Sequence, residues 1–191
     1  VAQQTGQPDE FIRAMLQVIN NCMIDYDKVD KLANFDIEYI FLKLRGNSVS
    51  TLAKIQIWDN DVEEYVQVEV DLDQVEVKSE LPDSLVDVSE DIKLQLRPPS
   101  FPDLLVLEDN DTMADSVDLV VKIIDKVYSG DEVHELKDFS EEEQIEFVNS
   151  LPADTFATIQ SFLNDLPAVE YEAKYKIKVD GKNKNKIEKM S

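Results

Sequence analysis

The most constraining feature of this chain is residues 30–46, a block in which apolar side chains leave almost no polar face. Acidic residues lie near its start and basic residues near its end, the arrangement that the dipole of a helix favours. Asn34 is expected to cap this helix, and Gly46 to end it in the left-handed conformation. Because a helix that is apolar nearly all round is buried on several sides, the block predicts the centre of a core. Its core signature consists of Phe35, Ile37, Tyr39, Phe41, Leu42 and Leu44.

The rest of the first half shows one helical pattern and several strand patterns. Residues 8–24 place apolar side chains at helical spacing, which predicts an amphipathic helix. Residues 52–70 alternate apolar and polar side chains on either side of a turn at 59–61, which predicts a hairpin. Residues 75–77 and 92–96 predict two further short strands.

Helical periodicity returns in the second half. One helix is expected to run as far as Val127, and Ser140 with Glu143 forms the sequence of a capping box that opens another. A further helix is expected to begin at Pro152. Alternating residues then predict a hairpin over 169–187 that turns at Asp180-Gly181.

These patterns predict an α+β fold, in which several helices pack against small antiparallel hairpins and sheets. We expect residues 1–168 to form a core domain of helices and antiparallel sheet. Residues 169–191 are expected to form a C-terminal lysine-rich β-hairpin that packs on this core.

The C-terminal hairpin concentrates lysine in an acidic chain. One interpretation is a ribbon that docks on an acidic partner. The other is an edge hairpin that its lysines protect from aggregation, a common device that favours this second interpretation. The candidate partner-binding residues are Lys174, Lys176, Lys178, Lys182, Lys184 and Lys186.

Charge excludes some classes of partner. The chain has 41 acidic and 19 basic residues, a net charge of −22, so its field repels nucleic-acid phosphates and anionic membranes. No apolar run is long enough to span a bilayer. The acidity is typical of solvated faces, and it also fits an alternative function, that of an acidic inhibitor or DNA mimic that acts on a host enzyme.

Residues that carry catalytic or metal chemistry are few. Cys22 lies on the apolar face of the first predicted helix, so we expect a buried structural thiol. A small hydrolase would need a pocket that joins His134, the single histidine, to convergent carboxylates. The acidic stretches 59–64 and 108–111 lack the glycine and terminal glutamate of an EF-hand and are expected to be solvated turns. We therefore expect a protein that is not an enzyme and has no cofactor or metal.

Several motifs in this chain also carry a family resemblance. An Asn-Cys pair at 21–22, Val-Asp-Lys-Leu at 29–32, Phe-Asp-x-Glu-Tyr-x-Phe-Leu-x-Leu-Arg at 35–45 and Ser-Val at 48–49 resemble the signature of the T4-type phage baseplate hub family. Residues 124–133 are similar to a helix end followed by Gly-Asp-Glu-Val in that family.

The resemblance implies a non-enzymatic structural or assembly component of the central hub of a contractile-tail baseplate. Such a protein would bind other baseplate hub or tail proteins as an oligomer or a hetero-complex. It would lie in the virion tail, in the host cytoplasm during assembly, or in both. Some relatives are expected to carry Cys-x-x-Cys pairs at two hairpins, where this chain has 59–61 and 179–182, so we expect no zinc here. The resemblance also implies a strand and a helix before residue 1.

Overall fold

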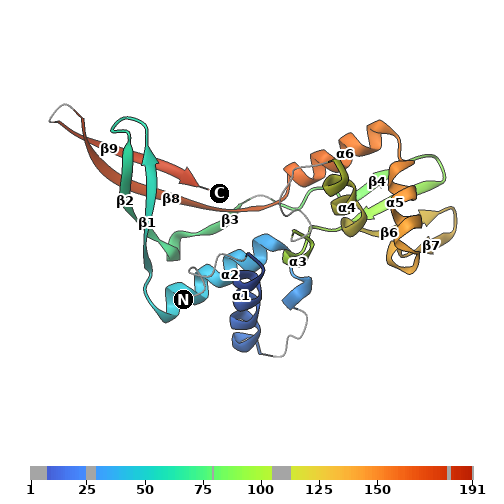
Figure 1. The fold of residues 1–191 in the computed structure, drawn as a ribbon, viewed down its shortest axis with the longest axis horizontal. Helices are drawn as coiled ribbons and strands as arrows, with labels where there is room; N and C mark the ends of the chain where they lie inside the picture. Colours follow the sequence, from blue (N-terminus) through green and yellow to red (C-terminus); the bar gives the residue numbers. More distant parts are fainter. Residues whose placement is uncertain (1–7, 25–28, 79, 105–112, 180–181, 191) are drawn as a thin grey trace.

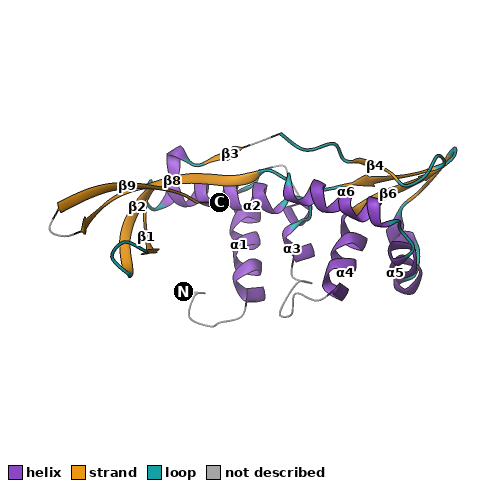
Figure 2. Cartoon of the chain, turned by 90° about the horizontal axis from the view of Figure 1, so that it is seen from above, coloured by secondary structure: helices purple, strands orange, loops and turns teal. Residues whose placement is uncertain are grey.

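The computed structural model of the chain describes residues 8–24, 29–78, 80–104, 113–179 and 182–190. Within these residues the fold is α+β, as predicted, with three small antiparallel sheets and helices packed around them. The molecule is elongated: two hairpins lie at one end, a lobe of sheet and helices lies at the other, and α1 and α2 lie between them (Figure 1). Figure 2 shows α1, α3, α4 and α5 projecting to the same side of this long axis.

Helix α2 spans Asn34–Ser48 and has two buried faces. Phe35 packs in a core with the two hairpins, and Ile37 packs in a second core with helix α1, Pro8–Cys22. Phe35 and Ile37 are buried, whereas the other signature residues are half-buried and divide between the cores: Tyr39 and Leu42 on the hairpin side, Phe41 and Leu44 on the α1 side. The lack of a polar face in the sequence therefore reflects one helix shared by two cores.

Both predicted ends of this helix are wrong. Ala33 occupies the N-cap position without a side-chain hydrogen bond, and Asn34 is the first helical residue. The backbone N–H of Asn34 donates a hydrogen bond to the carbonyl of Pro99 at 3.1 Å. Gly46 lies inside the helix, with ordinary backbone angles, because the helix continues to Ser48. A Cβ at Gly46 would lie 3.4 Å from Leu72 Cβ, an ordinary van der Waals contact.

The predicted hairpins are present. Strands β1 (Leu52–Asp59) and β2 (Glu64–Asp71) form a two-stranded antiparallel sheet. Strand β3 (Glu76–Lys78) pairs with β8 (Ala168–Val179), which pairs in turn with β9 (Lys182–Met190). The turn expected at Asp180-Gly181 lies outside the described residues. The division of the chain after residue 168 stays a prediction, although β8 and β9 do pack in the same core as α2, β1 and β2.

The opposite end of the molecule, which we call the sheet lobe, surrounds its own core. Its sheet has the order β4-β5-β6-β7, and three helices pack with it. The elements are β4 (Leu85–Asp87), β5 (Ile92–Leu96), α4 (Met113–Ile123), β6 (Ile124–Ser129), β7 (Glu132–His134), α5 (Glu141–Asn149) and α6 (Ala153–Asn164).

The prediction of a helix that runs as far as Val127 is wrong for residues 124–127. Helix α4 ends at Ile123, and the chain continues directly as strand β6. The turn into β7 explains why, because Gly130 has a φ of +57°, the left-handed conformation that a tight hairpin requires. The strand pairing of 124–129 thus overrides its helical spacing. The capping box of Ser140 and Glu143 is confirmed.

A short segment joins the sheet lobe to α2. Asp103, in the single-turn helix α3 (Phe101–Leu104), accepts hydrogen bonds from Arg97 at 2.7 Å and from the amide and hydroxyl of Ser100 at 2.7 and 2.6 Å. Ser100 forms an isolated β-bridge with Ala33, just before α2. This buried polar network fixes the connection between the two halves of the molecule.

Candidate functional site

The two long hairpins, β1–β2 and β8–β9, form a unit that we call the double hairpin. Their inner faces contribute Ala53, Val68, Ala173 and Ile177 to one core, all of them buried. Each hairpin therefore has one covered face and one outward face, and the two outward faces lie on opposite sides of this sandwich. The double hairpin projects from one end of the molecule (Figure 1).

A buried carboxylate connects the two hairpins. The side chain of Asp59, at the end of β1, has no exposed surface and accepts hydrogen bonds from Lys186 Nζ at 2.8 Å and from Tyr175 Oη at 2.7 Å. Asp61, in the turn, accepts a hydrogen bond from Lys184 at 2.7 Å and lies 3.0 Å from Lys186. We call these five residues the clasp.

The charges of the clasp stabilise one another. The hydrogen bond from Lys186 holds the pKa of Asp59 at about 2, below the ordinary value of 3.8, and the bond from Tyr175 acts in the same direction. The hydrogen bond to Asp59 raises the pKa of Lys186. Burial, followed by the bond to Asp59, raises the pKa of Tyr175. These shifts keep Asp59, Lys186 and Tyr175 in one protonation state near neutral pH, which suits a role in fixing the hairpins rather than in transferring protons.

The clasp overturns the expectation of a solvated turn at Asp59. A signal for it was present in the sequence, because Asp59 follows Ala53, Ile55 and Ile57 at the spacing of the inward-facing side chains. An aspartate in that register needs a buried partner, since an unpaired buried charge is very unfavourable. Only the fold identifies that partner, which lies 127 residues away in Lys186.

The alternation of β8 and β9 divides the six candidate lysines into two sets. Lys184 and Lys186 stand opposite buried residues of β8, Ile177 and Tyr175, so they face the β1–β2 hairpin. Lys182 shares their register. The outward set is Lys174, Lys176 and Lys178, all exposed on β8.

The outward face of β8–β9 is therefore a basic strip on an acidic protein. Lys174 lies 3.7 Å from Glu172, and within the described residues neither Lys176 nor Lys178 belongs to an ion pair. Across from them β9 presents Asn183, Asn185 and Ile187, and the side chain of Ile187 is 62% exposed. A groove of about 310 Å³ here is lined by Lys174, Tyr175, Lys176, Asn185, Lys186 and Ile187.

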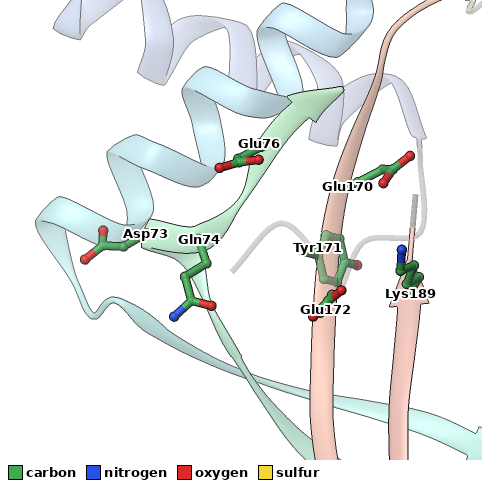
Figure 3. A pocket seen from close by; sticks show the side chains of 7 residues that line it. All are labelled: Asp73, Gln74, Glu76, Glu170, Tyr171, Glu172 and Lys189. Carbon is green, nitrogen blue, oxygen red and sulfur yellow. The ribbon is translucent and has the colours of Figure 1, made fainter. Parts of the chain in front are cut away.

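A second groove, of about 400 Å³, lies at the base of the same sheet (Figure 3). Its carboxylates come from the turn at 72–74, from β3 and from β8, and Gln74, Tyr171 and Lys189 complete the lining. Glu76 and Glu170 stand directly opposite each other in the β3–β8 pairing. The acidic lining consists of Asp73, Glu76, Glu170 and Glu172.

The structure does not bring together the residues that a catalytic interpretation needs. Cys22 is exposed at the end of α1, so the expected buried thiol is wrong. His134 lies on β7 in the sheet lobe, 3.3 Å from Glu132 and against the ring of Phe139. Among the described residues no group of three or more His, Cys, Asp or Glu side chains could hold a metal ion. No helix in the described part of the chain is long and apolar enough to cross a membrane.

Comparison with known protein families agrees with a structural protein. A family described as T4 bacteriophage base plate protein matches residues 1–191, the whole chain. The chain belongs to this family, and it is thus a structural component of a T4-type phage baseplate, which indicates a location in the virion tail and interaction with other baseplate proteins. No curated protein and no solved structure matches it.

Proposed function

We propose that this protein is a non-enzymatic component of the central hub of a contractile-tail baseplate. It binds other hub or tail proteins, and the double hairpin is its binding arm. The basic strip of Lys174, Lys176 and Lys178 contacts an acidic surface of one partner. The inward lysines hold the arm in shape instead of meeting that partner.

The observation that carries this proposal is the division of the lysines by strand register. Protection of a sheet edge would require only exposed lysines, not a lysine that pairs with a buried aspartate. Here Lys186 satisfies Asp59 inside the sandwich, and Lys176 and Lys178 are left exposed on a rigid ribbon. Positive charge on one face of a chain with a net charge of −22 favours encounter with an acidic partner through that face.

The test is capture of partners from infected cells, combined with mass spectrometry of purified virions. The test variant carries Lys176→Glu and Lys178→Glu. The matched control carries Lys31→Glu and Lys122→Glu, which change the net charge equally at exposed lysines outside the double hairpin. We expect the wild type and the control to capture hub or tail proteins and the test variant to lose that capture while it stays folded.

The location of the protein distinguishes a permanent hub subunit from an assembly chaperone that is released. Stoichiometric presence in virions identifies a permanent hub subunit, whereas capture of hub proteins without presence in virions identifies an assembly chaperone. Equal capture by the test variant and the control refutes the basic strip as the contact. Capture of a host enzyme in place of baseplate proteins would favour the acidic inhibitor or DNA mimic.

A further inference from the structure

Strand β9 forms a free edge of the double hairpin. It is the outer strand of the β3-β8-β9 sheet, and its register with β8 is continuous from Lys182 to Met190. Among the described residues, no backbone hydrogen bond other than this pairing involves β9. In an antiparallel pair, every second residue of an outer strand directs its N–H and C=O away from its neighbour. Over the nine residues of β9, roughly 30 Å, these groups are open to a further strand.

This edge lacks several of the devices that keep sheet edges from pairing. The described strand has no proline and no bulge, each of which would interrupt an added strand. Inward-pointing charges are another such device, but Asp61 and Asp59 already pair with Lys184 and Lys186. Exposed lysine also discourages pairing, and it does so least for a strand that carries carboxylates. The edge is therefore open to an acidic strand in particular.

The outward face beside the edge shows how such a strand would fit. The outward side chains of β9 at three successive positions are uncharged, and each stands opposite a lysine of the basic strip. The pairs are Asn183–Lys178, Asn185–Lys176 and Ile187–Lys174. A strand added to β9 lies roughly 9–10 Å from β8, a distance that a glutamate and a lysine side chain span together across an asparagine. The 62% exposed Ile187 leaves room for an apolar neighbour at the third position.

A second copy of this chain is a poorer occupant of the same edge. Pairing of two β9 strands about a two-fold axis would place two basic strips on one face of the joined sheet. The exposed Lys176 and Lys178 of both copies would then add to the same positive field, which opposes the association. Charge complementarity favours an acidic strand from a different protein.

We propose that a partner of this protein adds an extended acidic strand to the free edge of β9. Main-chain hydrogen bonds to β9 hold the strand, and carboxylates at alternate positions meet Lys176 and Lys178 across the intervening asparagines. The inference rests on the proposed function, because it takes the basic strip as the contact for an acidic partner. It deepens that function by assigning the partner segment an extended backbone and an alternating pattern of acidic side chains.

The experiment uses the full chain and a short peptide of alternating glutamate and threonine with blocked ends. Its control is the same peptide with every backbone amide N-methylated, which keeps the side chains and charge but removes the donors that extend a sheet. Titration calorimetry measures affinity, and hydrogen–deuterium exchange reports on the backbone amides of 182–190. We expect the first peptide to bind and to slow exchange in β9. The methylated peptide should bind at least about tenfold more weakly and leave that exchange unchanged.

Two double variants test the contribution of the basic strip to this binding. Lys176→Glu with Lys178→Glu should weaken binding of the glutamate peptide by about tenfold, because two attractive charges become repulsive. The matched control, Lys31→Glu with Lys122→Glu, changes the net charge equally at exposed lysines outside the double hairpin. It should change the affinity by less than about twofold.

Several results would overturn the added strand. Equal binding of the methylated peptide, or binding without slower exchange in β9, would leave only a side-chain contact with the basic strip. Equal weakening by the two double variants would mean a response to overall charge, and absence of binding would also refute the inference. Capture of partners from infected cells tests the proposed function without these peptides, so the strip can be confirmed there while strand addition fails here.

Discussion

Ile37→Ala tests the finding that α2 joins two cores. The side chain of Ile37 has no exposed surface and packs against α1. Alanine removes three carbon atoms, and the lost burial corresponds to about 2.4 kcal/mol at roughly 0.8 kcal/mol per carbon. A cavity left between two helices adds to this, and the better helix propensity of alanine returns a few tenths, so we expect a loss of about 3 kcal/mol.

The matched control is the same substitution at Ile24, whose side chain is 87% exposed. Ile24→Ala should change the free energy of unfolding by less than about 0.5 kcal/mol. For a chain of this length, a loss of about 3 kcal/mol lowers Tm by roughly 6–12 °C. Urea unfolding, followed by circular dichroism and by Trp58 fluorescence, measures the loss of unfolding free energy and shows whether it extends to both cores.

The two probes report on different parts of the molecule. Trp58 lies on the double hairpin, while Ile37 lies in the core with α1. Because α2 contributes to both cores, we expect Ile37→Ala to shift both unfolding curves together. If Ile37→Ala is no more harmful than Ile24→Ala, Ile37 is not buried as described. If only the circular dichroism curve shifts, α2 does not couple the two cores.

Two further predictions concern the clasp and the interior of α2. The hydrogen bond from Lys186 holds the pKa of Asp59 at about 2, against an ordinary 3.8. The stabilisation by the charged carboxylate is therefore complete above about pH 4 and is lost as pH falls through 2. The Tm difference between wild type and Asp59→Asn should shrink from pH 5 to pH 2, and a constant difference would contradict a charged clasp. Gly46→Ala should raise the free energy of unfolding, measured with urea, by about 0.5–1 kcal/mol, because the glycine is helical and a Cβ would only touch Leu72. A lower free energy of unfolding would instead support the left-handed helix end expected from the sequence.

Local patterns in the sequence were sufficient for most of the secondary structure. The amphipathic helix near the N-terminus, the two long hairpins and the capping box at Ser140 all depend on residues close together in the chain, and all are present. Residues 124–129 show where such reasoning fails, since their spacing suits a helix and a strand alike. The Gly130 turn and pairing on both sides by β5 and β7 decide in favour of the strand.

The candidate site depends on long-range contacts, which local patterns do not contain. The lysines of the C-terminal hairpin are conspicuous in the sequence, but their division into inward and outward sets requires the identity of the covered face. That face is determined by the contact of β8 with the β1–β2 hairpin, and the chain separation between Asp59 and Tyr175 is 116 residues. In the same way, Cys22 lies one turn from buried Ile19 yet is exposed, because α1 ends there.

The long separation between the two halves of the clasp also sets an order of events during synthesis. At about 5–20 residues per second, Tyr175 leaves the ribosome roughly 6–23 s after Asp59, 116 residues later. Throughout that interval the β1–β2 hairpin has no β8–β9 hairpin to cover its apolar face, while the intervening sheet lobe can already collapse around its own core. The double hairpin is thus the last part of the described chain to be completed. Partners that recognise its outward faces meet a finished arm only after translation has passed β9, which delays docking until the protein is otherwise folded.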